Sequence, residues 1–224
     1  MPLINVVPLF IPGFLNLKLD IDLVMPDISN KIGKGGTASI FRGTLVNDSL
    51  ISRYGGTKDV AIKVSEPKPN ETEEKRTRRI QDLMYEIAIM SSLPSCTNIV
   101  QFIGFVEAPR QCIVMKYYSS SLSALIGDSN ARISQDTVIN IGFQIANGME
   151  VIHSKGVLHL DIKPNNILMD HLPDGRFDCV ICDFGFASLV GDSQDRVVSG
   201  LNVPTTTGIT FRYCAPEVKS SFSY

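Results

Sequence analysis

The sequence predicts an α+β fold in which a β-rich part with one helix precedes a mainly helical part. Between residues 32 and 64 it is rich in β-branched side chains and punctuated by glycines, as in strands joined by turns. Two later segments repeat apolar residues at helical spacing. Because one helical segment lies within the β-rich part and the other follows it, we expect two lobes that meet near residue 118.

Four apolar, β-branched segments are predicted to be strands. They are residues 39–46 (SIFRGTLV), 60–64 (VAIKV), 99–106 (IVQFIGFV) and 111–118 (QCIVMKYY). A polar stretch that contains glycines links the first two, and we expect no further helix there.

Two long helices are predicted. The first opens at Asn70, because Glu73 follows in a capping-box pattern, and the second has Ser134 as its N-cap and ends at Gly156. The apolar positions are Ile80, Leu83, Met84, Ile87 and Met90 in the first, and Val138, Ile141, Ile145, Met149 and Ile152 in the second. The basic run 75–79 (KRTRR) is interpreted as a solvated helix face.

Length and composition limit the classes of protein to which the chain can belong. The 224 residues, 44% hydrophobic, predict one domain or two small lobes that need no disulfide or metal to be stable. The 21 Lys and Arg against 23 Asp and Glu give a net charge of −2, which argues against nucleic acid or an anionic membrane as a partner. Collagen-like, disordered and disulfide-scaffold classes are excluded as well.

The five cysteines are odd in number and scattered, which favours a reduced, cytoplasmic location. Cys179 and Cys182 form a C-x-x-C within a segment that reads as a strand, 177–182 (FDCVIC). Strand positions three apart point to opposite faces, so these thiols cannot share a metal or a redox step. Buried strand cysteines are the better interpretation.

The first 17 residues carry no charged side chain. This stretch is shorter than the ~20 residues of a membrane-spanning helix, is interrupted by prolines, and lacks the basic start of a signal peptide. We therefore expect residues 1–28 to be an apolar leader that docks on the domain rather than a membrane anchor.

A glycine-rich turn is the first chemical motif. Gly33, Gly35 and Ala38 fit G-x-G-x-x-A, a pattern that alone also matches a dinucleotide-binding turn. That reading requires a helix after the turn, whereas residues 39–41 (SIF) continue as a strand. A glycine-rich hairpin can instead lay backbone N–H groups over phosphates.

Lys63 and Glu86 are predicted to form an ion pair. Lys63 lies near the end of a strand, and Glu86 lies on or beside the apolar face of the first helix. A carboxylate there is costly unless it is paired. The pair would resolve that cost and aim the ammonium at a polyphosphate.

The stretch 159–166 (HLDIKPNN) is the most informative. Asp161, Lys163 and Asn166 place a base, a cation and a neutral metal ligand in one loop. Asp183 then opens the sequence DFG after a strand. Asn166 and Asp183 offer the oxygen ligands that suit Mg²⁺, and Asp161 is left to accept a hydroxyl proton.

The chain resembles eukaryotic protein kinases. The glycine-rich loop, VAIK, the helix Glu, H-x-D-x-K-x-x-N, DFG and APE (215–217) occur in the order of that family, between about residue 32 and residue 217. The resemblance implies a two-lobed protein-kinase-like fold, with a small lobe over 29–117 and an incomplete helical large lobe over 118–224.

The resemblance also implies a site for ATP and Mg²⁺. Lys63 would hold the α- and β-phosphates, Asn166 and Asp183 would hold Mg²⁺, Asp161 would orient the acceptor hydroxyl and Lys163 would meet the transferred phosphate. Further nucleotide contacts would come from Ile32, Gly33, Gly35, Ile40, Ala61, Glu86, Met115, Lys116, Tyr118 and Leu168. Among these Met115 would gate the back pocket, and the backbone near Lys116 and Tyr118 would bind the adenine. Met90, Phe102, His159 and Phe184 would stack as a spine.

Three departures from the family pattern stand out. Ala38 replaces the third loop glycine, for which we expect a mild effect, and Leu160 replaces the Arg that couples the loop to an activation-segment phosphate. Ser193, Ser199 and Thr205–Thr207 are interpreted as exposed loop residues. The family continues well beyond the position of Glu217, so we expect a fragment, a truncated gene model or a degraded copy.

The expected function is transfer of the γ-phosphate of ATP to Ser or Thr hydroxyls of protein substrates. Lys163, two residues after Asp161, resembles the Ser/Thr type, and residues 208–217 (GITFRYCAPE) resemble the tyrosine-kinase-like group. The alternative is an inactive pseudokinase or interaction module. A small-molecule kinase is disfavoured, because the APE motif resembles a platform for peptide substrates.

Overall fold

The computed structural model describes residues 17–20, 22, 24–34, 38–67, 69–108, 110–189 and 211–216. These residues divide into two compact units, one formed by the residues up to 92 together with 101–117, and the other by 93–100 and the residues from 118 onward. The predicted small lobe, 29–117, includes residues 93–100, which belong to the second of these units. The reason is backbone pairing, because Val100 N donates to Ile181 O at 2.9 Å and Ile181 N donates to Asn98 O at 3.0 Å.

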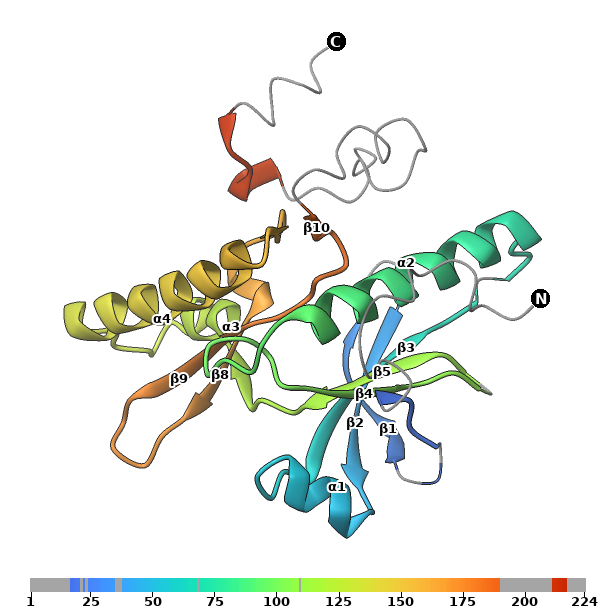
Figure 1. Cartoon of the computed structure of the whole chain (residues 1–224). Helices are drawn as coiled ribbons and strands as arrows, with labels where there is room; N and C mark the ends of the chain where they lie inside the picture. Colours follow the sequence, from blue (N-terminus) through green and yellow to red (C-terminus); the bar gives the residue numbers. More distant parts are fainter. Residues whose placement is uncertain are drawn as a thin grey trace. The chain divides into compact units, whose positions relative to one another are not determined.

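The first unit is built on a five-stranded antiparallel sheet (Figure 1). Its strand order is β1-β2-β3-β5-β4, with β1 at Val24–Lys34, β2 at Ala38–Leu45, β3 at Asp59–Ser65, β4 at Phe102–Val106 and β5 at Cys112–Lys116. All four predicted strands are confirmed, although β4 and β5 are shorter than predicted. β1 also takes in residues 24–28, which the sequence analysis assigns to the leader.

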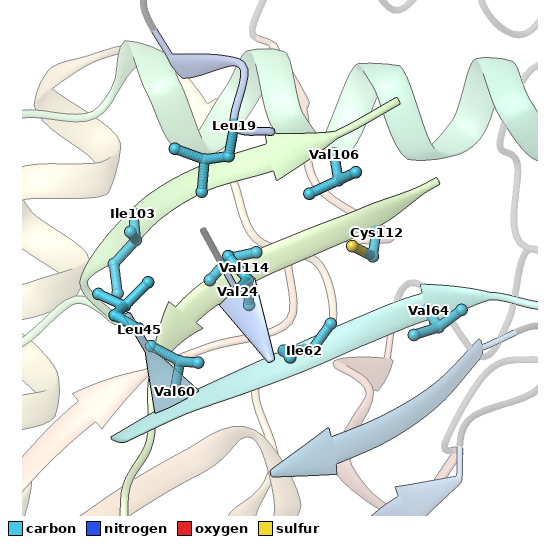
Figure 2. Packing of buried hydrophobic residues seen from close by; sticks show 10 residues of the cluster. All are labelled: Leu19, Val24, Leu45, Val60, Ile62, Val64, Ile103, Val106, Cys112 and Val114. Atoms are coloured by element: carbon cyan, nitrogen blue, oxygen red, sulfur yellow. The ribbon is translucent and has the colours of Figure 1, made fainter. Parts of the chain in front are cut away.

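One face of this sheet carries the hydrophobic core of the first unit. Figure 2 shows its buried residues, which are Leu19, Val24, Leu45, Val60, Ile62, Val64, Ile103, Val106, Cys112 and Val114. Leu19 comes from the leader, and its N–H donates to Phe105 O at 2.8 Å. Gly104 makes this close approach possible, because a Cβ there would lie 2.5 Å from Leu17 O. Residues 17–19 therefore pack on β4, and leader residues 1–16 lie outside the described part.

Two helices accompany the sheet, α1 at Asp48–Arg53 and α2 at Glu73–Ser92. α1 lies in the polar linker between β2 and β3, where the Asn47 side chain caps it by accepting from Leu50 N at 2.9 Å. The prediction of a single helix in the β-rich part is therefore wrong. The predicted cap of α2 is wrong as well, because Thr72 Oγ1 accepts from Lys75 N at 3.4 Å, whereas Asn70 has a φ of 60°.

The second unit contains α3 at Leu122–Gly127, α4 at Gln135–Ser154 and short 3-10 helices at Pro164–Asn166 and Phe211–Tyr213. One small sheet joins β6 (Ser120–Ser121), β8 (Ile167–His171) and β9 (Phe177–Ile181), and another joins β7 (Val157–Leu158) and β10 (Ser188–Leu189). Figure 1 shows β8 and β9 side by side. The predicted ends of α4 are confirmed, since Ser134 Oγ accepts from Thr137 N at 3.1 Å and Gly156 has a φ of 67°.

The α+β fold class is confirmed by this arrangement. The predicted apolar face of α4 is confirmed for Ile141 and Ile152, which are buried, whereas Val138 is 57% exposed. Among the described helices, none is both long enough and apolar enough to cross a membrane.

Candidate active site

The glycine-rich turn joins two antiparallel strands, as the sequence predicts. Gly33 and Lys34 of β1 pair with Ile40 and Ser39 of β2. Ile32 is 41% exposed on β1, and Gly35 lies outside the described residues. The motif therefore forms a hairpin and not the strand–turn–helix unit of a dinucleotide-binding fold.

The predicted ion pair between Lys63 and Glu86 is present. Lys63 Nζ lies 2.7 Å from Glu86 Oε1 and 2.9 Å from Oε2, and the two side chains are only 16% and 6% exposed. β3 carries the lysine, and α2, which packs against β3 and β4, carries the glutamate. Removal of either partner would take a close counter-charge away from a buried charge.

Lys63 shares its face of the sheet with apolar side chains. Residues directly opposite each other in an antiparallel pair point to the same face, as do residues two apart in a strand. Ile40 lies opposite Lys63, and Ala61 lies opposite Met115. The face opposite to the core of Figure 2 thus presents an apolar patch beside a cation, which suits an aromatic base joined to phosphates.

Two of the predicted adenine contacts lie near the end of β5. Lys116 N donates to Gln101 O at 3.0 Å, so the N–H of that residue is already used. Tyr118 is 8% exposed and belongs to the second unit, as does the half-buried Leu168 of β8.

In the second unit, Asp161, Lys163 and Asn166 form a hydrogen-bonded group. Lys163 Nζ lies 2.6 Å from Asp161 Oδ2. Asn166 Nδ2 donates to Asp161 O at 2.8 Å and to Asp161 Oδ2 at 2.9 Å. Asp161 and Asn166 are both buried, at 9% and 5% exposure. The 3-10 helix Pro164–Asn166 turns the chain back, and this turn returns Asn166 to Asp161.

Asp183 comes two residues after the end of β9, the strand that pairs with β8. Ile167 lies opposite Ile181, and Cys182 N donates to Asn166 O at 2.9 Å. Asp183 has a φ of 65°, a backbone conformation that costs a non-glycine residue about 1–3 kcal/mol and that clusters at functional sites. The pairing of the two strands therefore sets the position of Asp183 relative to Asn166.

This donor set fits Mg²⁺. Both donor bonds to Asp161 use the Asn166 amide nitrogen, so the amide oxygen is the atom that Asn166 can offer to a cation. Mg²⁺ is usually held by one or two protein carboxylates together with substrate phosphates and water. One carboxylate, Asp183, and one amide oxygen match that pattern.

His159 connects the two loops that carry Asp161 and Asp183. Its Nδ1 accepts from Asp161 N at 3.3 Å, so its Nε2 donates to Cys182 O at 3.0 Å. The ring lies 5.0 Å from the Phe184 ring. Burial is the main cause that lowers the pKa of His159, which favours the neutral ring. The predicted spine thus has one pair in contact here, whereas Met90 and Phe102 belong to the first unit.

Sequence reasoning missed a second ion pair on α2. Arg79, the last residue of the basic run, is buried and contacts Glu71 with Nε–Oε1 at 3.0 Å. The interpretation of 75–79 as a solvated face is therefore wrong for Arg79, although residues 75–78 are exposed. Helical spacing could have revealed it, because Arg79 is aligned with Leu83, Glu86 and Met90.

Other predicted features lie at the edges of the described part. Ala215 and Pro216 are exposed. Glu217 and the hydroxyl residues Ser193, Ser199 and Thr205–Thr207 lie outside the described residues. Cys179 and Cys182 are both buried, Cys179 in β9 and Cys182 just after it.

Comparison with known proteins places these features in a family. A family model described as the protein kinase domain matches residues 27–224. The serine/threonine/tyrosine-protein kinase HT1 of Arabidopsis thaliana is 32% identical over 88% of this chain and 45% of its own length. The tyrosine-protein kinase hopscotch of Drosophila melanogaster is 34% identical over 88% of this chain and 15% of its own.

A third relative is the stress-activated protein kinase alpha of Dictyostelium discoideum, 29% identical over 92% of this chain and 28% of its own length. The chain thus spans less than half the length of each of these relatives. The family model covers nearly all of the chain. The chain belongs to the protein kinase domain family.

Proposed function

We propose that this chain binds ATP with Mg²⁺ and transfers the γ-phosphate to Ser or Thr hydroxyls of protein substrates. The observation that carries the proposal is the buried Asp161 carboxylate with Lys163 Nζ at 2.6 Å and Asn166 Nδ2 at 2.9 Å. Short contacts hold a base, a cation and an amide in one loop. The backbone bond from Cys182 N to Asn166 O holds the residue before Asp183 next to that loop.

The roles follow from what phosphoryl transfer requires. The reaction depends on positioning and on stabilisation of charge on the phosphate oxygens. Lys63, held by Glu86, is the cation for the α- and β-phosphates. Asp161 accepts the hydrogen bond of the acceptor hydroxyl and orients its oxygen, while Lys163 offers its ammonium to the transferred phosphate. Mg²⁺, when held by Asn166 and Asp183, neutralises phosphate charge.

The adenine would rest on the apolar patch of Ile40, Ala61 and Met115. We propose that the glycine-rich hairpin, including Ile32, Gly33 and Gly35, lies over the phosphates, and that Leu168 and the backbone at Lys116 and Tyr118 complete the adenine contacts. Because Lys116 N–H is bonded to Gln101 O, a contact from Lys116 would use its carbonyl group.

The choice of Ser or Thr as acceptor rests on Lys163, two residues after Asp161. Among the relatives, HT1 is named a serine/threonine/tyrosine kinase and hopscotch a tyrosine kinase. The hydroxyl class and the protein nature of the substrate are therefore part of the proposal. We also propose a cytoplasmic location, from the odd and scattered set of cysteines, and no nucleic acid or anionic membrane as partner, from the net charge of −2.

A non-catalytic interaction module is the second candidate. Three large apolar side chains on α4 favour it, since Val138, Ile139 and Phe143 are 57%, 61% and 72% exposed. Exposed apolar patches of this kind mark interaction surfaces. In this case the chain would bind a partner and transfer no phosphate.

Asp161→Asn tests the proposed role directly. The substitution keeps the shape and removes the carboxylate that orients the hydroxyl, so turnover should fall by about 10²–10⁴ while ATP affinity is kept. Phosphate transfer to a Ser-containing peptide and ATP binding by calorimetry measure the two quantities. The control is Asp174→Asn, an exposed turn aspartate paired with Arg176, which should retain full turnover.

Near-wild-type transfer by Asp161→Asn would contradict the assignment. For the second candidate, the melting temperature of the wild-type chain is compared with and without Mg·ATP. A rise supports nucleotide binding, whereas an unchanged melting temperature together with no phosphate transfer favours the interaction module.

A further inference from the structure

Arg79 connects α2 to β3 at a point away from the Lys63–Glu86 pair. Its Nη1 donates to Ser65 Oγ at 2.7 Å, and its Nε and Nη2 contact the Glu71 carboxylate, each at 3.0 Å. The Arg79 and Glu71 side chains are both 8% exposed. We define these three residues, Ser65, Glu71 and Arg79, as the Arg79 clamp.

The Arg79 clamp and the Lys63–Glu86 pair join the same two elements. Ser65 follows Lys63 by two residues in β3, so both side chains point to one face of the sheet. Arg79 precedes Glu86 by seven residues in α2, which is about two helical turns and places both on one side of the helix. Each pair therefore fixes the distance between β3 and α2 at a different point along the helix.

Apolar packing does not hold the first residues of α2, 73–78, to the sheet. Residues 73–78 are exposed, and Arg79 is the first buried residue of the helix. A cavity of about 760 Å³ lies beside it, lined by Glu71, Arg76, Arg79, Arg110 and other polar residues. The first turns of α2 are thus held to the sheet by polar contacts.

The same end of β3 is also linked to the glycine-rich hairpin. Glu66, which follows Ser65, accepts from Ser39 Oγ at 2.9 Å, and Ser39 Oγ accepts from Lys31 Nζ at 2.6 Å. Ser39 is 1% exposed in β2. At the end of β3, Ser65 therefore contacts Arg79 of α2, and the next residue, Glu66, contacts Ser39 of the hairpin.

We infer that Arg79 is a positioning residue for nucleotide binding, which holds α2 against β3 so that Glu86 stays in contact with Lys63. The inference rests on the proposed function for the role of Lys63, whereas the structural effect on α2 can be measured without it. Loss of the clamp lets the start of α2 move from the sheet, and Glu86 then leaves the ammonium.

A double-mutant cycle tests whether Arg79 acts through Glu86. Ser65→Ala removes the hydroxyl that accepts from Arg79 Nη1 at 2.7 Å. It keeps the Arg79–Glu71 pair and the longer bond from Arg79 Nη1 to Ser65 O, at 3.4 Å. We expect it to lower kcat/KM for ATP by about tenfold, and we expect no further loss when it is added to Glu86→Gln. If the loss of kcat/KM in the double variant equals the product of the two separate losses, the inference is overturned, because Ser65 and Arg79 then act independently of Glu86.

A second measurement uses the chain without any activity. Arg79→Met alone would take the guanidinium away from the buried Glu71 carboxylate, so the matched variant is Glu71→Leu/Arg79→Met, because replacing a whole buried ion pair with apolar residues is often tolerated. Hydrogen exchange of the amides of residues 80–90 should become at least about tenfold faster in this variant, with β9 of the other unit unchanged. Unchanged exchange over 80–90 would overturn the inference.

The exposed Arg76 provides the control. Its Nη1 lies 3.8 Å from Glu73 Oε2, and its side chain is 59% exposed. Arg76→Met should leave both kcat/KM and the exchange of residues 80–90 within about twofold of wild type. If the wild-type chain binds no Mg·ATP, the proposed function fails, and the exchange measurement alone decides the role of the clamp. The two failures are thereby distinguished.

Discussion

His159 is a buried side chain whose two ring nitrogens hold two different loops. Nδ1 accepts from the backbone N–H of Asp161, and Nε2 donates to the carbonyl of Cys182, the residue before Asp183. This arrangement requires the neutral ring, because a protonated ring would have a donor at Nδ1 facing a donor. The buried side chain thus positions both candidate acidic residues.

Protonation of His159 should destabilise the fold at acidic pH. Burial lowers the pKa of His159 in the folded state below the ordinary value of 6.5. Below pH 6.5 the unfolded chain therefore binds the proton first, so the free energy of unfolding falls by up to about 1.4 kcal/mol per pH unit until the folded pKa is reached. Above pH 6.5 this contribution is fully retained.

Urea unfolding between pH 7.5 and 5 measures this effect. His159→Gln should unfold with a smaller loss of stability over that range, and His153→Gln, on the exposed side of α4, should retain the wild-type dependence. Equal pH dependence in the wild type and in His159→Gln would show that other groups are responsible.

At the scale of single residues, burial decided which interactions were predictable. Glu86 was predicted to pair because a carboxylate among apolar helix positions needs a partner, and Lys63 was available. Arg79 occupies the same line of the helix, yet it lies in a charged run and its partner Glu71 precedes the helix. Sorting the residues of the helix by the face on which they lie would have singled out both Glu86 and Arg79 as residues that need a partner.

At the scale of elements, the periodic segments were predictable and their partners were not. The strands and α4 follow from alternation, helical spacing and caps. The attachment of residues 93–100 to the second unit depends on Asn98, whose Nδ2 donates to Cys179 O at 3.0 Å and to Gln144 Oε1 at 3.2 Å. No local pattern shows contacts between residues so far apart in the chain.

Gly148 determines how closely α4 approaches its neighbours. A Cβ at Gly148 would lie 2.6 Å from Asn98 O and 2.9 Å from Ile181 Cδ1, whereas a Cβ at Gly142 in the same helix would meet nothing within 4 Å. Gly148→Ala should therefore destabilise the chain by about 1–3 kcal/mol, because the helix must move away from a backbone carbonyl.

The same substitution at Gly142 is the matched control. Gly142→Ala should stabilise the chain by about 0.5–1 kcal/mol, since alanine favours the helix and here has room. Urea midpoints of the two variants measure the contrast. Equal effects of the two substitutions would contradict the close packing of α4 described here.

At the scale of the whole molecule, the cysteines report on both units. Cys112 lies in β5 of the first unit, and Cys179 lies in β9 of the second; both are buried. Burial raises the pKa of each thiol to about 11. At pH 8 only about one thiol in a thousand would then be the reactive thiolate, even where a reagent could reach it.

Alkylation with iodoacetamide at pH 8 should therefore label the native chain at Cys96 and Cys214, which are half-exposed, and spare Cys112, Cys179 and Cys182. In concentrated urea all five should react, because unfolding returns the thiols to water and to an ordinary pKa. Mass spectrometry of each cysteine peptide across a urea series then follows Cys112 and Cys179 as separate probes of the two units. Coincident midpoints would show one cooperative transition, and separate midpoints would show two. Labelling of Cys112 or Cys179 as fast as Cys96 without urea would contradict their burial.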